Sequence, residues 1–352
     1  MPMKTRLVTT TLLLVSALVA GCATDTEDTE TAPARKAALI IAQGGIGDES
    51  YNDLAVSGFA AAATDFNVEG APIETDDPVA QGEQMLRRAA TTGFGLVIDL
   101  EFTHGEILPA IAAEYPDVKW AIVNTEAKGA NVVSILFDEQ DGSYLAGALA
   151  AMMTTVTGNP KINPDKKIGV IGGTKSVGID KFVSGYIQGA KDVDPAIEVL
   201  VSYSNGFGDP NKGSQLATSM FDQGADIVYH VAGGTGAGVF QAAKAANHYA
   251  IGVDTDQDDL APGFVLTSMV KRTDLAVRRM MAAYADGTFA GGQTVSLGIK
   301  DGGVSLSEFT QTKQDIPPAF LAKVDQLKTA IINGEVKVWN VISQGYPSWL
   351  AG

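Results

Sequence analysis

Short runs of apolar residues alternate with longer segments in which apolar positions recur every three or four residues, from about residue 36 to near the end of the chain. The short runs are continuous rather than alternating, which is typical of strands buried on both faces of a parallel sheet. The predicted strands are 38–41, 96–99, 120–123, 132–137, 168–171, 199–203, 227–231, 251–253 and 265–269. The predicted helices are 52–65, 78–91, 106–114, 140–153, 181–191, 210–223, 237–246, 273–286 and 317–333.

This alternation of strands and helices predicts an α/β fold with parallel sheets flanked by helices. About ten strand–helix units are too many for one open sheet, so we expect two α/β lobes. In such sheets ligands bind beyond the carboxyl ends of the strands. The loops that follow the strands are therefore where a functional site is expected.

The N-terminus carries a separate pattern. Lys4 and Arg6 precede a short apolar segment that ends in small residues and Cys22, the single cysteine of the chain. The segment is too short to span a membrane and is typical of a secretory signal peptide. Its end resembles a bacterial lipobox, so we expect Cys22 to be acylated and to hold the protein on a membrane. With Cys22 used in this way, a disulfide or a thiolate metal site is excluded.

The formal charge is −16, and removal of the first 21 residues deletes two cations and no anion, which gives −18. A chain of this charge without a basic run repels nucleic acid. The three histidines (His104, His230 and His248) are not spaced as zinc ligands and are expected to be structural. No nucleotide-binding glycine motif, phosphate-binding loop or G-x-S-x-G sequence is present. We therefore predict that the chain is a binding protein rather than an enzyme, and that it uses no cofactor or metal.

The loops after the predicted strands share one composition, rich in glycine, aspartate and asparagine. They comprise residues 43–53, 124–126, 207–209, 233–238 and 254–257. Glycines allow the backbone to approach a ligand, and the polar side chains suit hydroxyls and heterocycle edges. Tyr51 and Phe207 lie in the same loops and could stack on a planar ring. These loops predict a pocket for a neutral, hydroxylated solute that carries a ring.

Several blocks resemble one family, the basic membrane proteins, which are purine-nucleoside receptor lipoproteins of bacteria. Residues 48–53 (DESYND) resemble its D-x-S-F-N motif, and residues 137–147 (FDEQDGSYLAG) resemble its next block. Further similar blocks follow in family order, at 185–191, 232–239, 251–257 and 267–271. The resemblance implies a type I periplasmic-binding-protein fold, with two parallel-sheet lobes, three crossovers and a ligand cleft between the lobes. It also implies a substrate-binding subunit of an ABC transporter.

Carried over position by position, the resemblance implies ligand contacts from both lobes. The expected ligand-binding residues are Asp48, Tyr51, Asn52, Asp53, Asn124, Phe207, Gly234, Asp254 and Lys271. Among them Phe207 is expected to stack on the purine, and Asp254 and Lys271 to hold the ribose hydroxyls with the backbone of Gly234. Asn124 stands where family members commonly have aspartate, so base preference is expected to differ. At the end of the first strand, Ala42 and Gln43 offer no aromatic side chain, so a second wall for the ring is expected to be missing or supplied elsewhere.

The sequence therefore predicts a monomeric receptor that is anchored by lipid in the cell envelope and faces the periplasm or the exterior. This receptor is expected to deliver purine nucleosides to an ABC permease. Hinges are expected near Asp138 and Pro262. The expected parts are a signal peptide (1–21), a tether (22–36), a first lobe (37–137 and 262–295) and a second lobe (138–261 and 296–352).

Three alternatives stay open. The same fold could bind a sugar or an autoinducer, since aspartate- and asparagine-rich loops also suit polyols. Asp254, Asp256 and Asp258 alternate like the first ligands of a calcium loop, which leaves a calcium-assisted nucleoside hydrolase possible; however, Asp259 and Val265 replace the glycine and glutamate of such a loop. The third alternative is a surface adhesin that takes no part in transport.

Overall fold

The computed structural model describes residues 35–350. The expected signal peptide and the acylated Cys22 lie outside the described residues, as does nearly all of the expected tether. The tether was expected to reach residue 36, but the first strand, β1 (Lys36–Ile40), already begins there. Within residues 35–350, none of the helices has the length and apolar character needed to cross a membrane.

The first lobe is built on a six-stranded sheet in the order β11-β5-β4-β3-β1-β2, and all its pairings are parallel. Its further strands are β2 (Glu69–Ile73), β3 (Leu96–Asp99), β4 (Lys119–Val123), β5 (Val132–Phe137) and β11 (Gln293–Leu297). Its helices are α1 (Tyr51–Asp65), α2 (Gly82–Thr91), η1 (Phe102–Glu106), α3 (Leu108–Glu114) and α8 (Thr273–Ala285).

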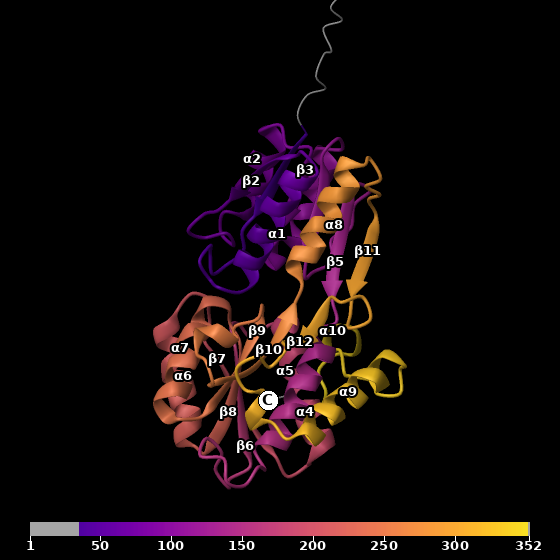
Figure 1. The fold of residues 1–352 in the computed structure, drawn as a ribbon. Helices are drawn as coiled ribbons and strands as arrows, with labels where there is room; N and C mark the ends of the chain where they lie inside the picture. Colours follow the sequence, from indigo (N-terminus) through magenta and orange to yellow (C-terminus); the bar gives the residue numbers. More distant parts are fainter. Residues whose placement is uncertain (1–34, 351–352) are drawn as a thin grey trace, which may run out of the picture. The chain divides into compact units, whose positions relative to one another are not determined.

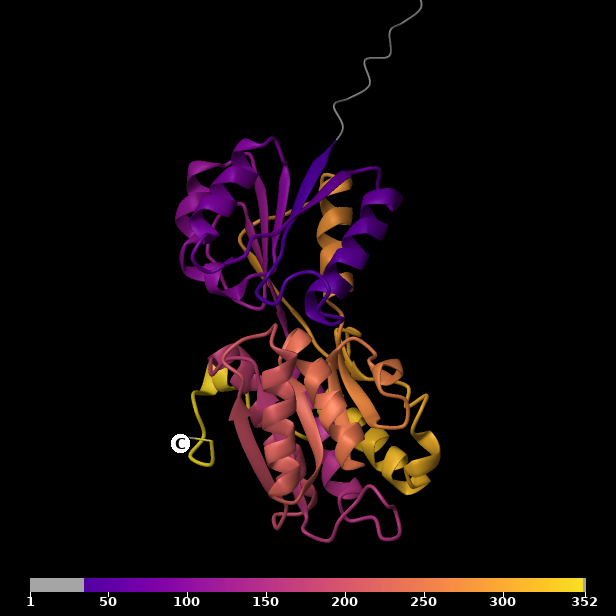
Figure 2. The same ribbon diagram turned by 90° about the vertical axis from the view of Figure 1, so that its left-hand side faces the viewer.

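Helices cover both faces of this sheet (Figure 2), which is why its central strands are apolar on both sides. On one face α1 packs beside α8, which is orange in Figure 1 although it comes far later in the chain. Phe59 of α1 and Val277 of α8 share that core with Leu39 of β1. On the other face α2 and α3 pack against alternate residues of the same strands, such as Ile40.

The second lobe contains a six-stranded sheet in the order β12-β10-β9-β8-β6-β7, in which only the β10–β12 pair is antiparallel among the described strands. Its strands are β6 (Lys167–Gly172), β7 (Glu198–Tyr203), β8 (Ala225–Val231), β9 (Tyr249–Asp254), β10 (Val265–Lys271) and β12 (Val304–Leu306). Its helices are α4 (Glu139–Met153), α5 (Val177–Val193), α6 (Pro210–Asp222), α7 (Gly236–Ala246), α9 (Pro318–Ile332) and α10 (Val341–Gln344), with short turns η2 (Gly233–Thr235), η3 (Asp258–Leu260) and η4 (Lys313–Asp315).

Helices α4 and α5 cover one face of the second sheet, and α6 and α7 cover the other. The backbones of α4 and α5 touch because glycines face the partner helix. A methyl group on Gly147 of α4 would collide with the carbonyl oxygen of Tyr186, and one on Gly189 of α5 would collide with that of Tyr144. Glycine is therefore required here for close approach rather than for backbone conformation.

The chain passes between the two sheets three times: at Asp138 between β5 and α4, at Arg272 between β10 and α8, and through residues 298–303 between β11 and β12. The crossing at Asp138 coincides with an expected hinge. The second expected hinge, Pro262, does not lie at a crossing, because it precedes β10, which pairs with β9 in the second sheet. Residues 265–271, expected in the first lobe, thus form a strand of the second sheet.

The two-lobe α/β architecture with mainly parallel sheets is confirmed, and every predicted strand and helix is present with small shifts at its ends. Three strands were not predicted, namely β2, β11 and β12. β2 and β11 lie at the edges of the first sheet and are largely exposed, and β12 has only three residues. Strands of this kind lack the continuous apolar run by which the buried strands were found.

Candidate functional site

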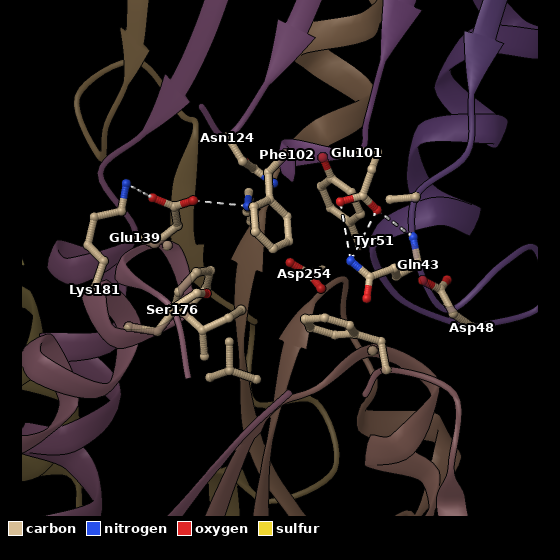
Figure 3. Close-up of a pocket in the computed structure, with 18 residues that line it drawn as sticks. Gln43, Asp48, Tyr51, Glu101, Phe102, Asn124, Glu139, Ser176, Lys181 and Asp254 are labelled. Carbon is tan, nitrogen blue, oxygen red and sulfur yellow. Dashed lines mark hydrogen bonds and ion pairs between the residues drawn. The ribbon is translucent and has the colours of Figure 1, made fainter. Parts of the chain in front are cut away.

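A pocket of about 710 Å³, partly open to solvent, lies where the carboxyl ends of strands from both sheets meet (Figure 3). Its lining residues come from both lobes: Ala42, Gln43, Asp48, Tyr51, Glu101, Phe102, Asn124, Glu139, Ser176, Gly178, Ile179, Lys181, Phe182, Phe207, Val231, Gly233, Asp254 and Lys271. The position at the strand ends is the one expected for parallel sheets.

Aromatic side chains reach the pocket from both lobes. Phe207 comes from the loop after β7, and its ring lies so close to Gly173 that a methyl group there would overlap it. Phe102, at the start of η1 after β3, lines the pocket from the first lobe (Figure 3). It supplies an aromatic wall that the sequence did not reveal after the first strand. Tyr51 also lines the pocket, and its hydroxyl donates to the carbonyl of Leu100 at 3.0 Å.

Asp254 and Asn124 directly end or follow central strands and both adopt left-handed backbone conformations, with φ of 68° and 71°. Such values are uncommon outside glycine and concentrate at functional sites. Asp254 Oδ2 accepts a hydrogen bond from Ser50 Oγ at 2.7 Å. Burial raises the pKa of Asp254 to about 6, although the charge of Lys271 opposes this rise. The buried Oδ1 of Asn124 has no hydrogen-bond partner among the described residues, so it is available to a donor in the pocket.

Three charged residues form a buried network at the pocket edge. Glu139 Oε1 lies 2.9 Å from Lys271 Nζ, and Glu139 Oε2 lies 2.5 Å from Lys181 Nζ. Lys181 also donates to the carbonyl of Phe137 at 2.7 Å. The Nζ of Lys271 lies 5.0 Å from the centre of the Tyr51 ring, within the range of a cation–π contact. Lys271 was expected at the site; Glu139 and Lys181 were not.

A second polar group in the pocket is formed by Gln43 and Glu101. The backbone N–H of Gln43 donates to Glu101 Oε2 at 2.9 Å, and its side-chain amide donates to Oε1 at 3.2 Å (Figure 3). Thr103 donates to the same carboxylate through its backbone and its hydroxyl. Glu101 comes two residues after the predicted strand 96–99. Its place in the loop that follows this strand was therefore a usable signal, which sequence reasoning missed.

Of the expected ligand-binding residues, the structure brings six to the pocket lining: Asp48, Tyr51, Asn124, Phe207, Asp254 and Lys271. Asn52, Asp53 and Gly234 do not line it. Asn52 is fully buried and its side chain ties Ala42 and Gln43 to α1. Asp53 accepts the backbone N–H groups of two residues in its own loop. Gly234 lies next to Gly233, which lines the pocket instead.

The aspartates of the calcium-like sequence do not converge. Asp254 points toward Ser50, whereas Asp256 Oδ1 accepts the backbone N–H of Asp258 at 3.1 Å. Asp258 accepts from Ser307 at 3.3 Å. In the part of the chain that the structure describes, no group of three or more histidine, cysteine, aspartate or glutamate residues is placed to hold a metal ion.

A two-lobe fold with a pocket at the strand ends of both sheets defines a solute-binding protein, and comparison with known proteins specifies the class. The family described as "ABC transporter substrate-binding protein PnrA-like" matches residues 35–340. The chain belongs to this family and is a substrate-binding protein of the ABC transporter type, a class that acts outside the cytoplasm.

Curated relatives match along nearly the whole chain. The "ABC transporter nucleoside-binding protein BmpA" of Lactococcus lactis is 32% identical, over 96% of this chain and 99% of the relative. The "CD4+ T-cell-stimulating antigen" of Listeria innocua is 31% identical, over 93% of this chain and 96% of the relative. An uncharacterized lipoprotein of Pyrococcus abyssi is 33% identical, over 86% of this chain and 76% of the relative.

Solved structures agree with the fold. A solute-binding protein of an ABC transporter system from Aeropyrum pernix superposes with a TM-score of 0.79 and 28% identity, covering 87% of this chain and 93% of the other. A solute-binding protein from Conexibacter woesei superposes with a TM-score of 0.67 at 24% identity, covering 87% and 99%, and supports the fold alone. The predicted family and the predicted fold class are thus both confirmed.

Proposed function

We propose that the protein is a lipid-anchored receptor that binds purine nucleosides and presents them to an ABC permease, without making or breaking a covalent bond. The observation that carries this proposal is one pocket that combines aromatic side chains from both lobes, Phe102 and Phe207, with a buried carboxylate, Asp254. Aromatic rings suit a planar base, and a carboxylate suits adjacent hydroxyls. The name of the Lactococcus relative, a nucleoside-binding protein, supports the same class of ligand.

The ribose is assigned to Asp254 and Lys271. Asp254 Oδ2 accepts from Ser50, and the remaining acceptor capacity of the carboxylate can take ligand hydroxyls. Lys271 pairs with Glu139, but an ammonium group has three N–H donors, so the pairing leaves donors for a hydroxyl oxygen. Glu139 thereby balances the positive charge of Lys271 at a buried site.

The base edge is assigned to Asn124. Its unpartnered Oδ1 can accept from a ligand N–H, and its amide nitrogen can donate. An amide matches either an amino or an oxo group on the purine. We therefore expect adenosine, inosine and guanosine to bind within about tenfold of one another, which is roughly 1.4 kcal/mol. Asn124→Asp is expected to sharpen the preference, because a carboxylate only accepts.

The cellular part of the proposal rests on the N-terminal sequence. Acylation of Cys22 and removal of residues 1–21 place the protein on a membrane, facing the periplasm or the exterior. A relative from Pyrococcus abyssi carries the name lipoprotein, which supports this proposal. Cys22→Ser is expected to move the protein from the membrane fraction to the soluble fraction, and equal membrane retention would contradict the anchor.

Isothermal titration of the purified protein with inosine, adenosine, guanosine, ribose and arabinose tests the ligand class. Nucleosides are expected to bind and free sugars to give no heat; tight binding of a sugar alone would overturn the proposal. Phe207→Ala is expected to weaken every purine nucleoside by about 1–3 kcal/mol, the range measured for loss of stacking. Incubation with inosine, with and without EDTA, and chromatography for free base separates a receptor from a hydrolase.

A further inference from the structure

The loop of residues 47–53 is held in one shape by two carboxylates that face inward. Asp48 accepts the backbone N–H groups of Ser50, Asn52 and Asp53. Asp53 accepts those of Gly47 at 2.8 Å and Glu49 at 2.9 Å. Glu49 lies in the left-handed region with φ of 49°, which costs energy for a residue with a side chain. The loop thus has a defined shape that is stabilised by its own acidic residues.

This shape directs two polar groups of the first lobe toward the second lobe. The carbonyl oxygen of Glu49 accepts from Gln257 Nε2 at 2.9 Å. Ser50 Oγ donates to Asp254 Oδ2 at 2.7 Å and lies 3.4 Å from the carbonyl of Val253. Asp254 ends β9, and Gln257 follows it in the same loop. Both hydrogen bonds therefore join the lobes beside the pocket, at a distance in sequence of about 200 residues.

The orientation of the Gln257 amide is fixed by its neighbours in the second lobe. Its Oε1 accepts from the backbone N–H of Val253 at 2.8 Å and lies 3.0 Å from His230 Nε2. Since Oε1 can only accept, the proton of the neutral imidazole lies on Nε2. His230 is fully buried, and its Nδ1 has no partner within residues 35–350. With Oε1 held inside the second lobe, Nε2 faces the first lobe.

We propose that Gln257, held by His230, is a latch residue that keeps the lobes closed around the bound ligand, with the Glu49 carbonyl as its partner. Gln257 does not line the pocket, so it is a positioning residue and contributes to residence time rather than to recognition. The three crossings allow the lobes to separate, and opening breaks the Gln257–Glu49 and Ser50–Asp254 hydrogen bonds while leaving each lobe intact. The ligand-dependent part of this inference rests on the proposed function.

Gln257→Glu tests the latch with little change of shape. A carboxylate keeps the bonds from Val253 and His230 but cannot donate to the carbonyl of Glu49, and it places a negative charge against that oxygen. In the full-length protein, stopped-flow measurement with inosine is expected to show dissociation about tenfold faster, with the association rate changed less than twofold. Small-angle scattering of the inosine-saturated protein is expected to show a larger radius of gyration than for the wild type.

Gln188→Glu is the matched control. Gln188 in α5 makes the same pair of bonds, accepting from Trp339 N–H at 2.8 Å and donating to the Lys337 carbonyl at 3.1 Å, but entirely within the second lobe. Its variant is expected to leave both rates and the scattering unchanged. If Gln257→Glu does not fold, Ser50→Ala removes the Ser50–Asp254 hydrogen bond between the lobes and is expected to show the same pattern of rates.

The two proposals fail in different ways. If Gln257→Glu and Ser50→Ala both dissociate within twofold of the wild type and scatter identically, the latch is overturned while nucleoside binding stands. If the wild type binds no nucleoside, the proposed function is overturned, and the ligand-free proteins decide the latch by scattering. A larger radius for Gln257→Glu than for wild type and Gln188→Glu supports it, and equal radii overturn it.

Discussion

Glu139 Oε1 lies 2.9 Å from Lys271 Nζ, and these two residues stand beside two of the three crossings between the lobes. Glu139 begins α4 directly after Asp138, and Lys271 ends β10 directly before Arg272. Lys181 of α5 pairs with the second carboxylate oxygen of Glu139. All three side chains are buried, so the carboxylate neutralises charges that water does not reach. The network thus holds the chain in place at these two crossings and at one edge of the pocket.

Glu139→Gln is expected to lower the free energy of unfolding by about 3–5 kcal/mol at pH 7, because it leaves two buried lysines without their shared carboxylate. Urea denaturation followed by circular dichroism measures the change. Glu198→Gln is the control, since Glu198 pairs with Lys167 at 3.3 Å in an exposed position and surface pairs contribute about 0–1 kcal/mol. Equal effects of the two substitutions would contradict a buried network.

The interaction of Glu139 with Lys181 and Lys271 also makes the stability of the wild type depend on pH in the acid range. Burial alone would raise the pKa of Glu139, but Lys181 and Lys271 hold it below its ordinary value of 4.5. The folded state therefore favours the ionised form more than the unfolded state does. Stability from this carboxylate is present above pH 4.5 and is lost as the pH falls through the lower folded pKa. The Glu139→Gln variant is expected to lack this part of the acid dependence.

Asp254→Asn is expected to stabilise the ligand-free protein and to weaken ligand binding. Burial raises the pKa of Asp254 from 3.8 to about 6, so the folded state disfavours the charge. Above pH 6 this costs about 2–3 kcal/mol, and the cost disappears as the pH falls toward 4. Thermal unfolding at pH 7.5 should show the gain in the variant, and at pH 4.5 most of it should vanish. Asparagine tolerates the left-handed backbone of this position.

Binding by the same residue should depend on pH in the opposite sense. If the ionised carboxylate accepts ribose hydroxyls, wild-type affinity for inosine falls as the pH drops below about 6, by at most tenfold per unit. The Asn variant should bind inosine about 1.5–3 kcal/mol more weakly at pH 7.5. Asp254→Ala, which removes every hydrogen-bonding group of this side chain, should no longer distinguish inosine from 2′,3′-dideoxyinosine. A variant that loses affinity equally for both nucleosides would assign Asp254 a purely structural role.

Gly173→Ala is expected to weaken nucleoside binding without unfolding the protein. The new methyl group would overlap the ring of Phe207, and the ring has the pocket to move into. A displaced ring loses stacking, so titration with inosine should show a loss of about 1–3 kcal/mol. Gly206→Ala, in the loop that carries Phe207, is the control because nothing lies within 4 Å of its added methyl group. Unchanged affinity in both variants would argue against stacking on Phe207.

Gly189→Ala is expected to destabilise the second lobe by about 1–3 kcal/mol, because its methyl group meets the backbone of α4 at Tyr144 and neither backbone can yield cheaply. Gly178→Ala on the same helix meets nothing within 4 Å, and alanine favours a helix by up to about 1 kcal/mol. Urea denaturation should therefore give opposite signs for the two variants. A neutral Gly189→Ala would show that the helices can separate without cost.

Buried features of the fold could be read from the sequence because the relevant pattern is local. The strand at 132–137 is a continuous apolar run, and it matches β5 at both ends. β2 could not be recognised, since it is an exposed edge strand that contains Pro72 and Gly70. Its pairing with β1 depends on residues more than 30 positions away. Local patterns carry no information about such edge pairings.

The residues of the candidate site also divide into those that the sequence reveals and those that it does not. Asp254, Asn124 and Phe207 follow predicted strands, and their place in the pocket follows from sheet geometry. Lys181 could not be found in this way, because a lysine on a helix is ordinarily exposed. It is buried only because Glu139, a residue of another helix, neutralises it. The resemblance named Asn52 and Asp53, whereas the structure places them as supports of the loop next to the pocket.

The return of the chain to the first sheet has a consequence for the order in which the protein can fold. β11 pairs with β5, and α8 covers the face beside α1, yet both are synthesised after the strands β6 to β10 of the second lobe. During translation the first lobe therefore stays incomplete, with one edge of β5 unpaired and one face of the sheet partly uncovered. The second lobe is completed later still, since β12 follows β11 in turn. A ribosome-bound chain ending before residue 273 should consequently show an unprotected β5, however much of the second lobe it already contains.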